Sequence, residues 1–308
     1  VGSEMCIRDR TCPDEDFSNI LLQLNERTVW ILNRPLKHGD VFYESDPYKI
    51  NYYKKTYVNI DKPLLSITEP RSVSEALSFN GYNQYINLPN SFFNVWNNLS
   101  AGTVLMWIKI NNFHIYNNNG FDICDAFFVK QHDNVNSYSI LGVTDYQGET
   151  GDHFLKFQMI NGTNVIGSTV IQTGLWYQIA ATWDGSHIKI YVNGVLDASL
   201  SSGTELVDDS EPTNIQIGGW TTSSLFTDGL IDEVNLFDAA LSEFQISTLY
   251  NNGKGMAGNI SLPPWSNHLL AGYHMEDATD FSGNGFDGDI FNHIEAVTSP
   301  VNRRTILD

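Results

Sequence analysis

Hydrophobic and polar residues alternate along much of this chain, in the period-two pattern of half-buried β-strands. Between positions 187 and 193 an aliphatic side chain occupies every second position, at Ile188, Ile190 and Val192. The dipeptide Asp184-Gly185 precedes this run and Asn193-Gly194 follows it. Both are turn sequences, because glycine accepts a positive φ without steric cost. The pattern predicts a hairpin of two strands over 176–183 and 187–193.

Short β-prone runs separated by Gly, Asn and Asp recur from Ala76 to Tyr250. They occupy residues 76–79, 84–88, 103–110, 126–130, 137–143, 154–160, 175–183, 187–193, 195–200, 214–218 and 229–237. This spacing, with almost no helical periodicity, predicts an all-β fold made of two antiparallel sheets packed as a sandwich. One helix is expected after Ser242, a good N-cap, and the run Asn251-Asn252-Gly253 is expected to end it.

Charge and composition narrow the possible partners. The 308 residues include 36 acidic and 17 basic side chains, for a net charge of −19. Such a surface repels nucleic acid and anionic lipid, so neither is expected as a partner. No apolar stretch reaches the length of about 18 residues that a spanning helix needs, which predicts no membrane insertion. The cysteines, Cys6, Cys12 and Cys124, form no CxxC pair and predict no zinc site, and whether Cys12 and Cys124 pair stays open.

Five sequence blocks in a fixed order carry a resemblance to a known family. They are residues 76–89, 103–109, 176–185, 189–194 and the closing block 229–242 with 246–251, which contains the run Ile-Asp-Glu-Val. By these blocks the chain resembles the laminin-G-like, concanavalin A-like lectin/glucanase sandwich of secreted bacterial proteins. The resemblance implies a jelly-roll sandwich over residues 73–253, a place outside the cell or on its surface, and a role in recognition.

The same resemblance suggests how the chain is divided. Residues 1–10 resemble adapter-derived translation and are not expected to belong to the fold. Residues 11–72 are either the tail of an upstream module or strands added to the sandwich, and 254–267 are expected to be a linker. Residues 268–308 look like the segment that normally opens such a domain. They either begin a second copy, the arrangement favoured here, or fold back and complete the first sandwich.

Calcium is the cofactor that the resemblance implies, as a structural ion. Related sandwiches often bind Ca²⁺ through an acidic residue at the position of Asp232, with oxygens from the loop that opens the domain. By that resemblance the partner ligands are Asp280, Asn284 and Asp287. Ca²⁺ prefers several hard oxygen ligands, which these side chains offer. The alternative is that the three loop residues only shape tight turns.

Aromatic side chains in Asn- and Gly-rich loops suit carbohydrate, because rings stack on sugar faces. Trp220 follows Gly218-Gly219 and precedes a Thr/Ser run, so it is expected in a loop as a glycan or protein contact. Further candidate contacts are Trp96, His114 and Tyr116. Trp107, Trp176 and Trp183 lie in blocks that the family shares and are expected in the core.

Catalysis is not expected. A glucanase on this fold needs acidic residues alternating along one strand, with a retaining pair about 5–5.5 Å apart. No such run is present, and no nucleophile or metalloprotease motif occurs. The sequence therefore predicts a non-catalytic recognition module of a larger secreted or surface protein, binding a glycan or an extracellular protein alongside other domains of the same polypeptide. The alternatives are a structural spacer of a multidomain adhesin, or an accessory domain of a glycoside hydrolase.

Overall fold

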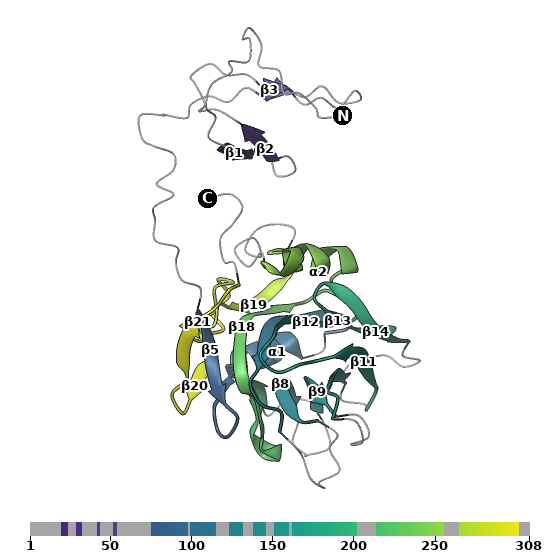
Figure 1. Cartoon of the computed structure of the whole chain (residues 1–308), viewed down its shortest axis with the longest axis vertical. Helices are drawn as coiled ribbons and strands as arrows, with labels where there is room; N and C mark the ends of the chain where they lie inside the picture. The colour runs from purple at the N-terminus through teal and green to yellow at the C-terminus, as the bar shows by residue number, and fades with distance from the viewer. Residues whose placement is uncertain are drawn as a thin grey trace. The chain divides into compact units, whose positions relative to one another are not determined.

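The computed structural model describes residues 75–97, 99–114, 123–131, 138–145, 151–159, 162–201, 214–255 and 265–301, and four short strands before them. The chain divides into two compact units, of which residues 1–72 form the first and residues 73–306 the second. In the first unit, β1 (Ile20–Gln23) pairs with β2 (Val29–Leu32), and β3 (Phe42–Tyr43) pairs with β4 (Tyr52–Tyr53). The second unit carries the predicted sandwich (Figure 1).

Two large antiparallel sheets form the sandwich, which confirms the predicted fold class. The seven-stranded sheet has the order β11 (Asn164–Val170), β10 (Phe154–Gln158), β9 (Tyr138–Thr144), β8 (Asp125–Gln131), β15 (Asn214–Ile217), β6 (Tyr85–Asn87) and β20 (Asp289–Phe291). The eight-stranded sheet has the order β14 (Val195–Ser201), β13 (His187–Val192), β12 (Trp176–Trp183), β7 (Gly102–Ile110), β18 (Asp228–Phe237), β5 (Glu75–Asn80) and β21 (Glu295–Thr298), with β19 (Leu269–Tyr273) also paired to β18. The predicted 176–193 hairpin is therefore β12 and β13.

One helix and one small hairpin cover the sheets from outside. The expected helix is α2 (Glu243–Tyr250), in which the Ser242 hydroxyl accepts a hydrogen bond from the Gln245 N–H and the Gln245 side chain accepts one from the Ser242 N–H. A second helix, α1 (Asn90–Trp96), is not predicted by the strand pattern. The remaining elements are β16 (Gly219–Trp220), β17 (Leu225–Phe226) and the 3₁₀ turns η1 (Thr221–Ser223) and η2 (Asn251–Gly253).

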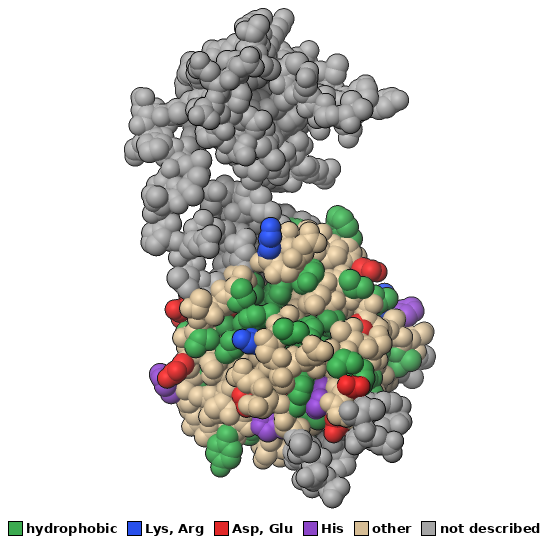
Figure 2. All heavy atoms as spheres, in the orientation of Figure 1, with side chains coloured by type: hydrophobic (Ala, Val, Ile, Leu, Met, Phe, Trp, Pro, Cys, Tyr) green, Lys and Arg blue, Asp and Glu red, His purple; other side chains and the backbone are tan. Residues whose placement is uncertain are grey.

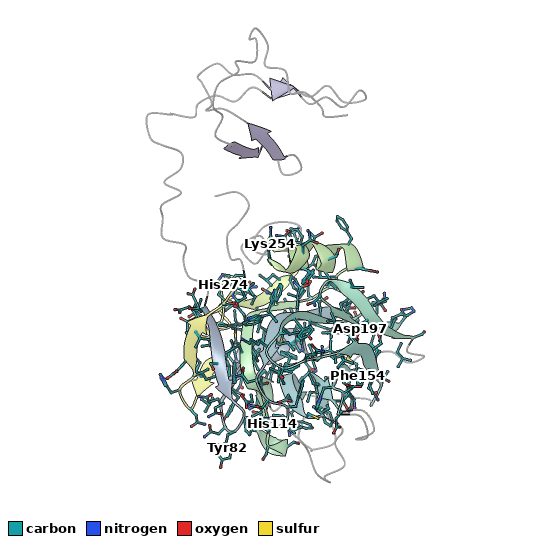
Figure 3. The ribbon with its side chains drawn as sticks, in the orientation of Figure 1. Tyr82, His114, Phe154, Asp197, Lys254 and His274 are labelled. Carbon is teal, nitrogen blue, oxygen red and sulfur yellow. The ribbon has the colours of Figure 1, made fainter. Side chains whose placement is uncertain are left out.

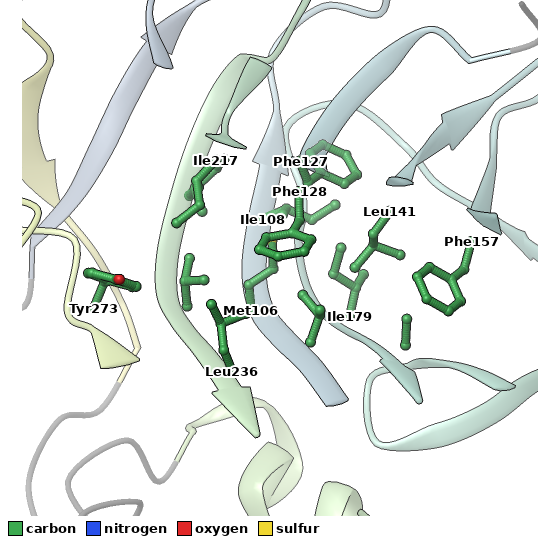
Figure 4. Close-up of a cluster of buried hydrophobic side chains, with 14 of the residues drawn as sticks. Met106, Ile108, Phe127, Phe128, Leu141, Phe157, Ile179, Ile217, Leu236 and Tyr273 are labelled. Atoms are coloured by element: carbon green, nitrogen blue, oxygen red, sulfur yellow. The ribbon is translucent and has the colours of Figure 1, made fainter. Parts of the chain in front are cut away.

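The main core lies between the two sheets. Met106 and Ile108 of β7 face Phe128 and Leu141 of the other sheet, and all four are at most 3% exposed (Figure 4). Side chains of this size contribute about 1.5–3 kcal/mol each when buried, so this layer supplies much of the driving force for folding. Two smaller clusters lie on the outer faces, one including residues of α2 and one including Trp220 and Leu225 of the β16–β17 hairpin.

Residues 265–301 belong to the same sandwich. β19 pairs with β18, β20 pairs with β6, and β21 pairs with β5. In Figure 1 the yellow C-terminal strands β20 and β21 lie beside the blue strand β5, which begins the sandwich. Tyr273 and Met275 of this segment are at most 1% exposed in the main core. The described part of residues 268–308 thus has the fold-back arrangement instead of the favoured second copy.

On the side of the sandwich away from the C-terminal segment, one carboxylate ties the edge strands of the two sheets together. Asp197 of β14 accepts hydrogen bonds from the backbone N–H and the hydroxyl of both Ser168 and Thr169 in β11, at 2.7–3.2 Å. β14 ends the eight-stranded sheet and β11 ends the seven-stranded sheet. The sandwich is therefore closed at one side by the C-terminal segment and fastened at the other by Asp197.

Candidate functional site

The outer face of β6 and β20 presents a compact group of aromatic and polar side chains. Ile86 is fully buried in the main core, so its neighbours Tyr85 and Asn87 point to the opposite, outer face. In the ladder, Phe291 lies opposite Tyr85, and Asp289 lies opposite Asn87. These four side chains form a square on one face of the seven-stranded sheet, called here the β6–β20 surface.

The two rings of this surface are stacked on each other. The centroids of Tyr85 and Phe291 are 4.6 Å apart and the ring planes differ by 6°. On the β15 side of β6, the ring of Phe226 lies 6.4 Å from that of Tyr85. Tyr85 is thus held between two rings, whereas Phe291 is on the edge strand and 39% exposed. Phe291 is the ring that this surface offers to a ligand, and Tyr85 supports it.

Amide and carboxylate groups lie beside the rings. The Gln216 side chain, opposite Asn87 on β15, donates from Nε2 to Asn87 Oδ1 at 3.5 Å. Its Oε1 accepts from the N–H and the hydroxyl of Thr221 at 3.2 and 3.1 Å, which fixes its orientation. Asp289 is exposed and Asn87 is half-buried. An apolar ring next to an amide and a carboxylate can contact the apolar face and the hydroxyl groups of the same sugar.

The two turns beside the surface are hydrogen-bonded to each other. Gln84 Nε2 donates to the backbone oxygens of Asn292 and His293 at 3.1 and 2.6 Å, and Asn292 Nδ2 donates to the Asn83 oxygen at 2.7 Å. Tyr82, in the same turn as Asn83, is 77% exposed and points away from the sandwich (Figure 3). These contacts hold β20 in place next to β6, so that the aromatic pair is built into the fold.

The two tryptophans predicted as ligand contacts are buried, so both predictions are wrong. Trp220 has no exposed surface: its indole Nε1 donates to Gln131 Oε1 at 3.0 Å and its ring lies 4.3 Å from that of Tyr138. It lies in the β16–β17 hairpin, which folds onto the outer face of the sheet. Trp96 is 4% exposed and packs edge-on against Trp183 at 5.4 Å. In both cases distant strands supply the covering atoms.

Of the other two predicted contacts, Tyr116 lies outside the described residues, and His114 is partly buried. His114 Nδ1 lies 2.8 Å from Oδ1 of Asp125, a residue with no exposed surface. The hydrogen bond to Asp125 raises the pKa of His114, whereas burial raises the pKa of Asp125. Figure 3 shows His114 at the same end of the sandwich as Tyr82. This histidine fastens a loop to β8, and its role as a ligand contact stays a prediction.

The predicted calcium ligands make hydrogen bonds of their own. The Asp280 carboxylate accepts from the backbone N–H groups of Gly272, Ser282 and Phe286 and from the Ser282 hydroxyl, at 2.8–3.0 Å. Asp287 accepts from the Asp280 N–H at 2.8 Å, and Asn284 Nδ2 donates to the oxygens of Leu269 and Leu270. These contacts match the turn-shaping alternative for the loop.

Asp232 lies elsewhere on β18, fully buried, and accepts a hydrogen bond from the Ser299 hydroxyl. Within the described residues, no three or more His, Cys, Asp or Glu side chains are grouped so that they could hold a metal ion. Asp232, Asp280 and Asp287 therefore do not form such a group. Calcium binding by this chain stays a prediction.

The residues of the β6–β20 surface are hard to find in the sequence because they are far apart in the chain. The alternation over 84–88 predicts the strand and places Tyr85 and Asn87 on one face. Nothing in the sequence shows that Phe291, about two hundred positions later, lies opposite Tyr85. The usable signal is the short alternating run Asp-Ile-Phe at 289–291, which indicates a strand. It does not indicate that this strand pairs with β6.

The fold and these contacts can be compared with known proteins. A family model described as the concanavalin A-like lectin/glucanases superfamily matches residues 80–247, which is more than half of the chain. The chain belongs to this superfamily. The match ends before β19, so β20, which contributes Phe291 and Asp289, lies outside the matched region. No curated protein matches the sequence.

Several solved structures are similar to this chain, and the first of them shares its fold. A candidate carbohydrate-binding protein from Bacteroides ovatus has a TM-score of 0.56 and 22% identity, with 75% of this chain covered and 62% of that one. The chain thus spans less than two thirds of the length of that relative. A heptameric pentraxin from Limulus polyphemus has a TM-score of 0.41 and 19% identity, covering 58% of this chain and 82% of that one. A sialidase module from Ruminococcus gnavus, bound to sialyllactose, has a TM-score of 0.42 and 12% identity, covering 56% and 96%.

Proposed function

We propose that this chain is a non-catalytic carbohydrate-binding module and that a glycan binds at the β6–β20 surface. The observation that carries the proposal is the partly exposed ring of Phe291, stacked on Tyr85 beside Asn87 and Asp289. A ring face takes the apolar side of a pyranose, and the neighbouring polar groups take its hydroxyls. The superfamily membership and the fold shared with a candidate carbohydrate-binding protein support this choice of ligand.

The absence of catalysis is part of the proposal. The adjacent acids of β18, Asp232 and Glu233, are at most 1% exposed, and their carboxylates contact Ser299 and His274. A glycosidase needs two carboxyl groups open to the scissile bond. Cys124 is a free, buried thiol whose pKa burial raises to about 12, so it is a poor nucleophile at neutral pH.

Such a module would act outside the cell, as one domain of a larger secreted or surface protein. Its binding would hold the remaining domains close to a polysaccharide or glycoprotein. Within the described residues no helix has the length and apolar character needed to cross a bilayer. This role distinguishes the proposal from a spacer domain, which would have the same fold and bind nothing.

The test is glycan binding by the wild-type chain and by Phe291→Ala, first on a glycan array and then by calorimetry with the best ligand. Removing a ring that covers roughly 80 Å² of sugar at about 25 cal/mol per Å² costs about 2 kcal/mol, or roughly thirtyfold in affinity. The matched control is Phe244→Ala, which removes a ring that is 79% exposed on α2, over the other sheet. Unchanged binding by Phe291→Ala, or no glycan binding by folded wild-type protein, would contradict the proposal.

A further inference from the structure

We infer that the β6–β20 surface selects neutral glycans and rejects those that carry carboxylates, such as sialic acids and uronic acids. The inference rests on the proposed function, because it names the class of glycan taken by the same site. Its basis is the charge of the sandwich, where cationic side chains are few and the charged residue at the surface is an aspartate.

Between residues 75 and 301 the chain contains no arginine. All seven arginines are found at positions 8, 10, 27, 34, 71, 303 and 304, outside the described part of the sandwich. Arginine is the residue whose paired N–H donors match a carboxylate, and lysine offers the other permanent positive charge. Lysine is therefore the only side chain of the described sandwich that stays fully cationic at neutral pH.

The lysines are not available to the β6–β20 surface. Lys130 and Lys156 are the two on the seven-stranded sheet, and they are only 5% and 3% exposed. Lys130 Nζ donates to Asn97 Oδ1 at 2.9 Å. Lys156 lies on β10, four strand positions from β6 in the sheet order, or roughly 19 Å at about 4.8 Å per strand. Lys109 and Lys189 belong to the other sheet, and Lys254 follows α2.

The one charged group of the surface is negative. Asp289 is exposed on the same face as Phe291 and opposite Asn87. Its two oxygens can accept hydrogen bonds from neighbouring hydroxyls of a neutral sugar. A ligand carboxylate at a similar distance would be repelled, by about 1 kcal/mol at 4 Å in water and more where water is excluded. Cationic side chains, drawn in blue, are also few over the face of the sandwich in Figure 2. The same residue thus favours neutral sugars and disfavours anionic ones.

The experiment compares matched ligands that differ at one group: oligosaccharides of galactose or glucose, and the same oligomers oxidised to the carboxylate at C6. Affinities are measured by calorimetry for the full chain, for Asp289→Asn, and for Glu243→Gln. The last variant removes one exposed negative charge from α2, on the opposite sheet. We expect the wild type and Glu243→Gln to prefer the neutral oligomer by about tenfold. Asp289→Asn should reduce that preference to about twofold, because the repulsion of about 1 kcal/mol is removed.

The outcomes separate the two proposals. Binding of neither oligomer by folded protein, repeated over a neutral and acidic glycan panel, would overturn the proposed function itself. Binding of the carboxylated oligomer at equal or higher affinity would leave a carbohydrate-binding module in place and overturn the neutral selectivity. A preference that is the same in the wild type and in Asp289→Asn would also overturn it, since the repulsion is assigned to this carboxylate. A preference that weakens as salt rises from about 0.05 to about 0.5 M would support the electrostatic cause.

Discussion

The Asp280 carboxylate allows a sharp test of what holds the loop after β19. Asp280 is 8% exposed. Its Oδ1 accepts from the N–H groups of Gly272 and Ser282, and its Oδ2 accepts from the Ser282 hydroxyl and the Phe286 N–H. The substitution Asp280→Asn leaves one acceptor oxygen and puts an NH₂ group where the other was. Whichever way the amide turns, at least one backbone N–H then faces a donor.

Each buried donor left without an acceptor costs about 1–3 kcal/mol, and the loss of the charge weakens the bonds that remain. We therefore expect Asp280→Asn to lower the free energy of unfolding by about 3 kcal/mol. In a domain of this size that corresponds to a fall in Tm of roughly 6–12 °C. The matched control is Asp277→Asn, the same change three residues earlier, where the carboxylate is exposed and accepts a hydrogen bond from the Thr279 N–H. Its cost should stay below about 1 kcal/mol.

Urea unfolding measures the free energy of unfolding and thermal scans measure the Tm. Each is run with calcium and with chelator. If backbone donors hold the loop, Asp280→Asn is destabilised equally in the two conditions. A wild-type protein that loses the same stability on chelation would show that an ion, as the family resemblance implies, holds the loop in place of these donors. A cost for Asp280→Asn no larger than that for Asp277→Asn would refute the hydrogen-bond argument.

Two further predictions concern single carboxylates that hold parts of the sandwich together. Asp197→Ala should lower the free energy of unfolding by about 1–2 kcal/mol, because four hydrogen bonds from Ser168 and Thr169 are lost. Amide hydrogen exchange in β11 and β14 should become faster, and unchanged exchange would show that other contacts hold the edges. Asp125 raises the pKa of His114, so the stabilisation from this pair is complete below pH 6.5 and is lost as the pH rises through the folded-state pKa. Unfolding free energies from about pH 6 to about pH 9 should fall for the wild type relative to His114→Gln, and parallel curves would contradict this.

Much of this fold can be predicted from the sequence, because hairpin turns and helix caps depend on residues that are neighbours in the chain. The hairpin of β12 and β13 follows from alternation and from the turn at Asp184-Gly185. The next hairpin, of β13 and β14, follows from Asn193-Gly194, whose positive φ angles of 52° and 78° the structure shows. The helix α2 follows from its capping residues. Helix α1 escapes prediction because Pro89 provides no side-chain cap, although the spacing of Phe92, Phe93 and Trp96 carries a helical signal.

Burial by distant partners is what the sequence could not show. The Gly-Gly pair before Trp220 and the polar run after it are typical of a loop, and the chain does turn there. The indole is nevertheless covered, because Tyr138 and Gln131 come from strands some 80 to 90 positions earlier. The partly exposed ring of Phe291 lies instead in a short strand, Asp289–Phe291, directly before the turn at Asn292 and His293. Exposure of an aromatic residue is thus a tertiary property, and a loop-like sequence is poor evidence for it.

The C-terminal segment connects stability and recognition in this sandwich. Residues 265–301 place Tyr273 in the core, pair β21 with β5, and carry β20 to the edge of the other sheet. The ladder with β6 holds β20, and the outward side chains of this strand, Asp289 and Phe291, form half of the proposed binding surface. A ligand that contacts both β6 and β20 would therefore stabilise the closed edge, since binding to the folded state alone shifts unfolding by mass action. A site assembled from two ends of one domain in this way exists only when the whole sandwich is folded.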